Sequence, residues 1–352
     1  MIRYFRRIIF TKTPLKGFYR FNDLFQILPI LSNKAPKNIL AVDFPIFLEY
    51  KVELEEEHFK QLESNILDYF SFQQDIENEY LSLLTVLTNH RFFIYSSNHC
   101  WALITPQNGF EGLSQNEIDL YNNQNSSWIY NAYCYPGLKD DLVISKFTEP
   151  NLPEVEIKPF FEYFTKDPFD ISDGVITFPN TLSSCLSNYF SLSPELQNKI
   201  KAALFLICNG IEIQDKMRSM AFLAFISSIE TIVSFEFPDI EIEYSCKSCK
   251  KLSKSQFVCE QCGSPVWGIR KKFTEFLSKF VAGGDNSIKK YKKIYDIRCQ
   301  IAHNGGLFLV DLESTFDDMD KKEKEWLMKI ESLQFARISI SNWLNSDDKA
   351  SR

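Results

Sequence analysis

The spacing of hydrophobic and polar positions differs between the two halves of the chain. In the first half, residues 46–54 alternate between apolar and polar, which is typical of a half-buried strand. The apolar face of this strand would carry Ile46, Leu48, Tyr50, Val52 and Leu54, and the polar face Glu49, Lys51 and Glu53. Helical spacing follows from Glu55 to about Thr88, and residues 91–95 and 100–105 resemble short strands. We therefore expect a mixed α/β domain over residues 1–190.

Helical spacing dominates the second half. Ser193 as N-cap and Pro194 at the first helical position open a helix that we expect to end near Gly210. Further helices are predicted from about Ile213 to Phe235, from Trp267 to about Val281, up to Asn304, and through Trp326 to Leu344. The prediction is an α+β chain whose C-terminal domain, residues 191–346, is an all-α bundle.

The helix that ends at Asn304 carries the most distinctive residues. Its buried stripe is expected to end at Ile301, with Asn304, Gly305 and Gly306 as C-cap residues. Arg298 and His303 stand near this end, with four residues between them. Five positions along a helix correspond to about 7.5 Å and a rotation of about 140°. The two side chains should therefore converge only if the last turn unwinds at His303, or across a two-fold interface with a second copy.

This helix end resembles the signature of the HEPN family, in which an Arg and a His separated by four to six residues form a metal-independent ribonuclease site. The segment Ile301-Ala302-His303-Asn304-Gly305 is also similar to the ending found in HEPN ribonucleases. The resemblance covers roughly residues 190–346. It implies a homodimer in which two copies contribute Arg298 and His303 to one cleft, and RNA as the substrate.

The residue types suit this chemistry. Cleavage of RNA without a metal needs proton transfer at the ribose 2′-hydroxyl and at the leaving oxygen, and a cation for the charge that grows on the phosphate. A His titrates in the right range, and an Arg offers a planar fork to phosphate oxygens. The alternative is that Arg298 pairs with Asp296 or Glu230 and that His303 only caps the helix.

Glu230 is an isolated acid within an apolar helical run. A carboxylate there is costly unless it is paired or close to the surface. HEPN proteins look similar, since the second helix of their hairpin carries an acid that faces the Arg and His. By that resemblance Glu230 would orient Arg298 or His303, and the alternative is an exposed glutamate on the far face of its helix.

Four cysteines form two closely spaced Cys-x-x-Cys pairs: Cys246, Cys249, Cys259 and Cys262. Such pairs supply the four thiolates of a tetrahedral zinc site. The spacing predicts a zinc ribbon over residues 244–266, inserted in the helical domain. With four thiolate ligands the Zn²⁺ would be structural, and no catalytic metal is expected. A redox dithiol pair is the alternative.

Charge is unevenly distributed along the chain. The net charge is −7, yet residues 246–303 hold thirteen Lys or Arg against four acids and so carry +9. A basic segment on an acidic protein favours a phosphate-bearing partner. Four residues of this segment are candidate RNA-binding lysines: Lys289, Lys290, Lys292 and Lys293. A solvated helix face is the alternative for them.

The remaining composition describes a soluble protein. Nine cysteines, an odd number, indicate a reducing compartment, and no apolar run approaches the length of a membrane span. We expect a cytoplasmic location and no membrane partner.

Two functions follow from these observations. The first is a HEPN-type endoribonuclease, which by resemblance would be a toxin or antiviral defence effector acting on RNA such as tRNA. Residues 1–190 would then be a regulatory or sensor domain on which a trigger or inhibitor acts. The second is a non-catalytic module that binds RNA, a nucleotide or a protein. Cys299, where active HEPN proteins usually have a polar residue, and the acidic bulk of the chain favour the second.

Overall fold

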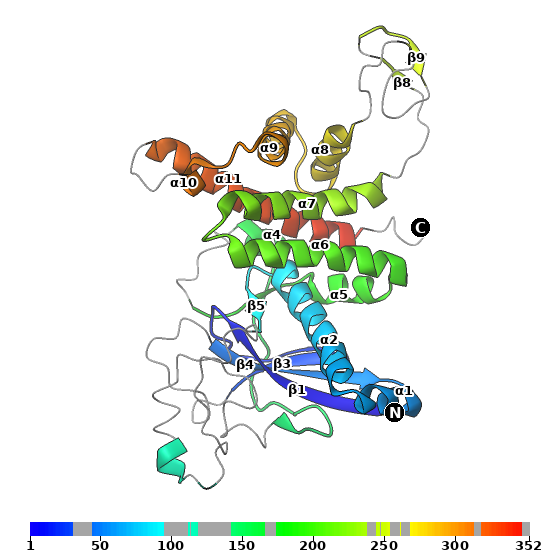
Figure 1. The fold of residues 1–352 in the computed structure, drawn as a ribbon, viewed down its shortest axis with the longest axis vertical. Helices are drawn as coiled ribbons and strands as arrows, with labels where there is room; N and C mark the ends of the chain where they lie inside the picture. Colours follow the sequence, from blue (N-terminus) through cyan, green and yellow to red (C-terminus); the bar gives the residue numbers. More distant parts are fainter. Residues whose placement is uncertain are drawn as a thin grey trace. The chain divides into compact units, whose positions relative to one another are not determined.

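A computed structural model describes residues 1–30, 44–94, 112, 114–118, 142–165, 174–237, 244–246, 248–253, 261, 268–312 and 318–346. The chain divides into two compact units, Met1–Ser183 and Ser184–Arg352 (Figure 1). The first contains a β-sheet with helices and the second is mainly helical, so the coarse α+β prediction is confirmed. The helical unit begins within α5 (Leu182–Phe190), earlier than the predicted start at residue 191.

The N-terminal unit is built on a five-stranded sheet of order β2-β3-β4-β1-β5. Its strands are β1 (Ile2–Thr11), β2 (Tyr19–Phe21), β3 (Phe25–Pro29), β4 (Phe44–Glu53) and β5 (Phe92–Phe93). All neighbours pair antiparallel. Strands β4 and β5 lie where the sequence predicted strands. Residues 100–105, the other predicted strand, lie outside the described part of the chain.

Helices α1 (Glu56–Ser64) and α2 (Ile66–Leu87) follow β4, within the predicted helical stretch. Helix α2 packs on one face of the sheet, where the Tyr80 ring stacks on Phe25 at 4.8 Å between centroids. The unit also contains α4 (Phe160–Thr165) and a parallel pair of short strands, β6 (Ile157–Lys158) and β7 (Phe178–Pro179).

Strands β1, β2 and β3 were not predicted, and β1 shows why. Its adjacent charged residues, Arg6 and Arg7, obscure the apolar alternation of the strand. In the structure they point to opposite faces of the sheet, and each pairs with a buried carboxylate, Glu49 or Glu77. Both arginines are only partly exposed, because their carboxylate partners come from other parts of the chain.

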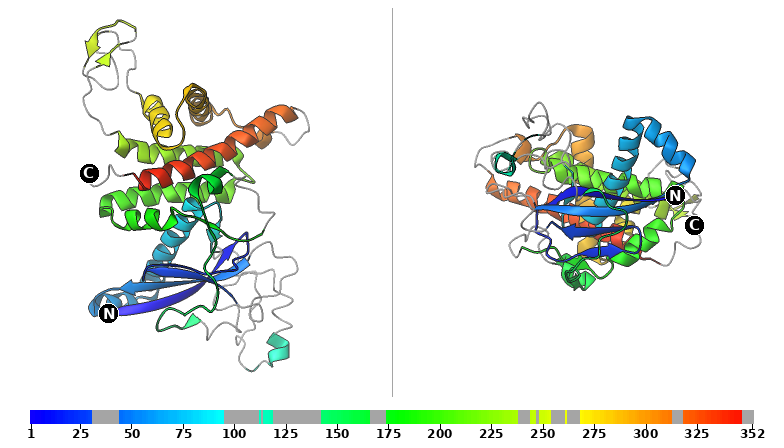
Figure 2. Two further views of the ribbon diagram at one scale, coloured as in Figure 1. Left: turned by 180° about the vertical axis from the view of Figure 1, so that it is seen from behind. Right: turned by 90° about the horizontal axis from the view of Figure 1, so that it is seen from below.

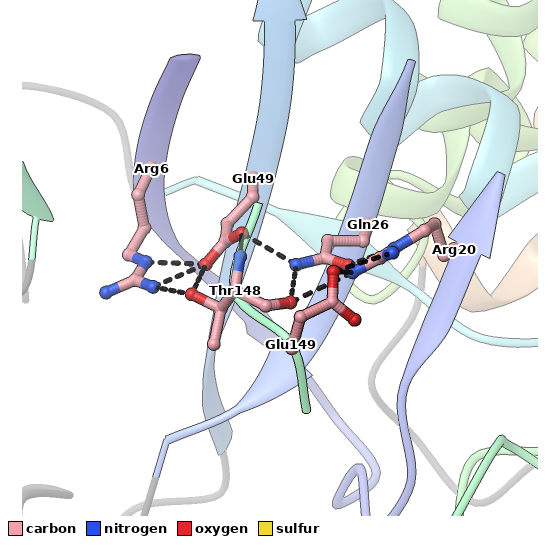
Figure 3. A network of polar contacts seen from close by, with 6 residues as sticks. All are labelled: Arg6, Arg20, Gln26, Glu49, Thr148 and Glu149. Atoms are coloured by element: carbon pink, nitrogen blue, oxygen red, sulfur yellow. Dashed lines mark hydrogen bonds and ion pairs between the residues drawn. The ribbon is translucent and has the colours of Figure 1, made fainter. Parts of the chain in front are cut away.

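The predicted polar face of β4 was also wrong at its centre. Glu49 is fully buried, because residues 147–149 cross this face of the sheet (Figure 3). Its carboxylate accepts hydrogen bonds from Arg6 Nε at 2.8 Å and from Gln26 Nε2 at 2.6 Å. Thr148 donates to it from both the backbone N–H at 2.9 Å and the hydroxyl at 2.8 Å. These bonds join three strands and a crossing segment into one network.

Glu77 lies on the opposite side of the sheet, and its buried carboxyl group is expected to make the stability of the unit depend on pH. Burial raises its pKa, an effect only partly offset by Arg7 and by the hydroxyl of Tyr50, which donates to Glu77 Oε1 at 3.0 Å. The folded state therefore binds this proton more tightly than the unfolded state. Its contribution to stability is complete below the ordinary pKa of a glutamate and is lost as the pH rises through the raised pKa.

We expect Glu77→Gln to remove this loss of stability. The parent should lose up to about 1.4 kcal/mol per pH unit within the titration range of Glu77, whereas the variant should not. Hydrogen exchange of peptides from β1 and β4 in the full chain, measured between roughly pH 5 and pH 8, reports the difference. Glu53→Gln, an exposed change on β4, is the control. Equal pH dependence in parent and Glu77→Gln would contradict the assignment.

The helical unit contains the five predicted helices, named α6 (Pro194–Ile213), α7 (Arg218–Glu236), α8 (Ile269–Phe280), α9 (Asp285–Asn304) and α11 (Met319–Leu344). Helices α6 and α7 run side by side, and α11 lies against α7 (Figures 1 and 2). A short helix α10 (Leu309–Leu312) and the hairpin strands β8 (Tyr244–Ser245) and β9 (Leu252–Ser253) complete the described elements.

The predicted end of α6 at Gly210 was wrong, since the helix continues to Ile213. Gly210 is a packing residue instead of a cap. A Cβ atom at this position would come within 2.5 Å of the Phe225 ring on α7. The glycine thus allows α6 and α7, the helix that carries Glu230, to approach closely.

Helix α7 is the one element among the described residues with the length and hydropathy of a membrane span. Just over half of its most apolar window is buried inside the unit. Its apolar character is explained by its contacts with α6, α8, α9 and α11.

Candidate functional site

Arg298 lies on the inward-facing side of α9. The buried residues of this helix include Tyr291, Ile294, Tyr295 and Ile301. Arg298 follows Ile294 by four positions and precedes Ile301 by three, so it shares their stripe. Its side chain is 21% exposed. The guanidinium is thus directed into the bundle and needs a counter-charge there.

Glu230 on α7 supplies that counter-charge. Arg298 Nη2 donates to Glu230 Oε2 at 2.9 Å, across 68 residues of sequence, and the Glu230 side chain is 11% exposed. The alternative of an exposed glutamate was therefore wrong, and Arg298 pairs with Glu230 and not with Asp296, which binds Arg270. Burial lowers the pKa of Arg298, but Glu230 raises it more, and the net shift is upward. Arg298 is a fixed cation.

His303 lies next to the same guanidinium. Its Nε2 is 3.5 Å from Arg298 Nη1, and its ring is exposed to solvent. Helix α9 does not unwind at His303 but continues to Asn304, and Gly305 caps it in the left-handed region with φ of 65°. The long Arg298 side chain bridges the angle between the two positions, so the pair meets within one chain. From ideal helix geometry we expected the two side chains to meet only if the last turn unwound or a second copy was present. The contact forms without either condition.

Tyr295 is a fourth member of the site that sequence reasoning missed. The centre of the Arg298 guanidinium lies 5.8 Å from the centroid of the Tyr295 ring, and Phe273 of α8 packs against this ring at 5.2 Å. Burial raises the pKa of Tyr295, and the nearby Glu230 carboxylate raises it further, so the hydroxyl keeps its proton. Its position in the sequence could have identified it, because Tyr295 lies three positions before Arg298 on the same buried stripe of the helix.

The chain that leaves His303 is anchored to the start of α7. The Asp311 carboxylate accepts hydrogen bonds from the backbone N–H groups of Arg218 at 3.0 Å and Ser219 at 2.6 Å, and so caps that helix. In return, the Ser219 hydroxyl accepts a hydrogen bond from Phe308 N–H at 2.8 Å. These bonds hold the segment after Gly305 against the helix that carries Glu230.

The four candidate lysines are all exposed, but they are not equivalent. Lys290 forms an ion pair with Glu331 of α11 at 2.6 Å. Within the described residues, no ion pair is found for Lys289, Lys292 or Lys293. These three therefore present their charge to solvent.

Two of the four predicted zinc ligands, Cys246 and Cys249, lie in the described part of the chain. Strands β8 and β9 pair antiparallel, and the turn between them holds Cys246 and Cys249. Cys246 N–H donates to Lys251 O at 2.9 Å, and Lys250 N–H donates to Cys246 O at 2.8 Å, with Lys250 in the left-handed region at φ of 62°. This tight hairpin brings both thiols onto one turn, which fits one pair of ligands of a four-thiolate zinc site.

The other predicted ligands, Cys259 and Cys262, lie outside the described residues. Among the described residues no group of three or more His, Cys, Asp or Glu side chains is placed to hold a metal. Cys246 and Cys249 are not joined to each other by a disulfide bond. The structural zinc site thus remains a prediction, with Cys246 and Cys249 as its described pair.

We expect the purified protein to contain stoichiometric zinc. A Cys246→Ser/Cys249→Ser variant should lose that zinc, because two thiolates of the four are removed. Elemental analysis of the protein after gel filtration measures the loss. Cys208→Ser, a cysteine on α6, should retain the metal. Zinc content near zero in the parent would contradict the ribbon and favour the redox alternative.

Comparison of the chain with protein-family models, with curated proteins and with solved structures found no match. The site is therefore interpreted from its own geometry. It contains a fixed guanidinium, a carboxylate that holds it, and an exposed imidazole 3.5 Å away. An Arg–His pair of this kind can bind a phosphate and exchange a proton with it.

Proposed function

We propose that the protein is a metal-independent endoribonuclease of HEPN type, in which Arg298 binds the scissile phosphate and His303 transfers protons. The observation that carries the proposal is the convergence of Arg298, Glu230 and His303 from two helices. Glu230 binds the Nη2 atom of Arg298 and so holds the guanidinium in place. The Nη1 atom then faces His303. The non-catalytic alternative, in which Arg298 pairs with Glu230 and His303 only caps the helix, also contains the Arg298–Glu230 pair. The C-cap residue of α9 is Gly305, however, and the His303 ring lies 3.5 Å from the Arg298 guanidinium.

The proposed reaction joins the ribose 2′-oxygen to phosphorus and breaks the bond from phosphorus to the 5′-oxygen. One proton leaves the 2′-hydroxyl and one is delivered to the 5′-oxygen, so the products are a 2′,3′-cyclic phosphate and a 5′-hydroxyl. Arg298 would stabilise the negative charge on the non-bridging phosphate oxygens. The proposal needs no catalytic metal, and the zinc predicted at the cysteine pairs would be structural.

Two proton transfers on opposite sides of the phosphate favour a homodimer. The described residues around Arg298 include one imidazole, that of His303. A second copy would bring a second His303 to the same cleft, as the family resemblance also implies. We further propose that the protein is an intracellular toxin or antiviral effector and that residues 1–190 respond to a trigger or inhibitor.

The test is incubation of the purified protein with total tRNA and with a generic single-stranded RNA. EDTA is added at a concentration that leaves the zinc content unchanged. The expected result is cleavage with cyclic phosphate ends. If metal ions are required, or if the ends are 3′-hydroxyls, the proposed chemistry is wrong.

A second candidate is a non-catalytic module that binds RNA, a nucleotide or a protein. It is favoured by Cys299, which directly follows Arg298 where a polar residue is usual in active HEPN proteins. Binding alone should survive His303→Ala, whereas cleavage should not. The effect of this variant on RNA or on cells therefore separates the two functions.

A further inference from the structure

The exposed side of α9 carries a row of residues that leads to His303. At about 100° per residue, Lys289, Lys292, Lys293 and His303 lie within about 100° of one another around the helix axis. The row spans about 21 Å from Lys289 to His303. Arg298 lies on the opposite, inward side, and only its guanidinium reaches the end of the row. We call Lys289, Lys292 and Lys293 the α9 lysine row.

Lys290 is excluded from this row by its position and its partner. It lies about 60° beyond Lys293 around the axis, where it pairs with Glu331 of α11 at 2.6 Å. Its charge is therefore already compensated. The α9 lysine row and Lys290 thus provide a comparison between free and compensated charges on one helix.

One acid, Asp296, interrupts the row between Lys293 and His303. An uncompensated carboxylate there would repel a phosphate chain that passes along the helix. Arg270 of α8 cancels this charge, because its Nη2 lies 2.6 Å from Asp296 Oδ2, and about half of each side chain is exposed. With Asp296 paired, no uncompensated acid interrupts the described exposed face of α9 from Lys289 to His303.

We propose that the α9 lysine row binds the phosphate backbone of the RNA substrate, and we call this surface the track. Arg270 neutralises Asp296 and so prevents its carboxylate from repelling the RNA. The track rests on the proposed function, since it ends at the proposed cleavage site. It assigns to the protein a subsite for nucleotides on one side of the scissile phosphate. It also predicts that RNA too short to reach Lys289 binds more weakly.

Binding of RNA by the His303→Ala protein tests the track without interference from cleavage. The probe is a fluorescently labelled single-stranded RNA of about one dozen nucleotides, and the dissociation constant is measured by anisotropy over a series of salt concentrations. Each lysine–phosphate contact contributes about 0.7 to the slope of log Kd against log salt for a single strand. Changing Lys289, Lys292 and Lys293 to Gln together should lower the slope by about 2.

Lys290→Gln is the matched control and should leave the slope unchanged. Gln has a helix propensity close to that of Lys, so α9 should persist in all these variants, and circular dichroism confirms this. If the triple variant keeps the parental slope, or if Lys290→Gln alters it as much as one of the three, the track is wrong. Absence of RNA binding by the His303→Ala protein would also overturn it.

Arg270 is tested by a double-mutant cycle in the same assay. Arg270→Gln should weaken RNA binding several-fold, because it exposes the Asp296 charge. Adding Asp296→Asn should restore the affinity if Arg270 acts through Asp296. Failure of this rescue would overturn the neutralising role and would indicate a direct contact between Arg270 and the RNA.

The outcomes separate the track from the nuclease. Cleavage by the parent together with an unchanged slope in the triple variant would reject the track and leave the nuclease intact. A lysine-dependent slope without cleavage by the parent, together with toxicity on overexpression that His303→Ala retains, would reject the nuclease and support the track as the surface of a binding module. If acidic peptides bind through the same lysines in preference to RNA, the partner is a protein and the RNA track is wrong.

Discussion

Replacing His303 with alanine is expected to reduce RNA cleavage by about 10²- to 10⁴-fold, the usual contribution of a positioned acid–base group. The stability of the helical unit should change little, because the ring is exposed and lies at the edge of the Arg298 guanidinium. Rates are measured under single-turnover conditions with saturating protein, so that a change in affinity does not contribute. RNA affinity should stay within a few-fold of the parent.

Gln300→Ala is the control for this variant, since Gln300 is an exposed polar residue one turn earlier on α9. It should retain the parental rate. Arg298→Ala is less informative by itself, because it also leaves the largely buried Glu230 carboxylate without its partner and so lowers stability. A His303→Ala protein that cleaves at the parental rate would exclude His303 as the proton-transfer group.

Replacing Glu49 with alanine is expected to destabilise the N-terminal unit by about 3–5 kcal/mol, the usual cost of leaving one partner of a buried ion pair uncompensated. Arg6, whose side chain is 10% exposed, would lose its counter-charge, and Thr148 would lose the acceptor of its N–H group. Urea unfolding of the full chain, with hydrogen exchange of β1 and β4 as the local readout, measures the change.

Glu53→Ala is the matched control, because it removes a glutamate from the exposed end of the same strand. Its effect should lie within about 0.5 kcal/mol. A small effect of Glu49→Ala would mean that the network in Figure 3 does not hold residues 147–149 against the sheet. The nuclease variants would not be affected by that result, because their residues belong to the other unit.

The helical unit was predictable because its signals are local. Ser193 and Pro194 start α6, Gly305 ends α9, and the spacing between these points follows the helical period. The pairing of Arg298 with Glu230 was one of several sequence alternatives, and helical period alone could not choose among them. The continuation of α6 through Gly210 was missed, because a packing glycine and a capping glycine look the same in sequence.

The N-terminal unit was predicted less well because its decisive partners are far apart along the chain. Glu49 is buried by Thr148, 99 residues away, so the alternation of β4 suggested an exposed side chain at a position that is fully buried. Arg6 and Arg7 likewise hid β1, since a sequence pattern treats charged residues as exposed. Pairing a charge with a distant partner changes which environment it prefers, and this is a property of the tertiary structure.

The sequence by itself determined the helices of the second unit, the position of Arg298 and His303 near a helix end, and the two cysteine pairs. Only the tertiary structure decided that Arg298 turns inward to Glu230 and still reaches His303, and that Lys290 is compensated whereas the α9 lysine row is not. The reason is physical. Periodicity and capping depend on neighbours within a few residues, whereas the partner of a charge depends on which helices pack together.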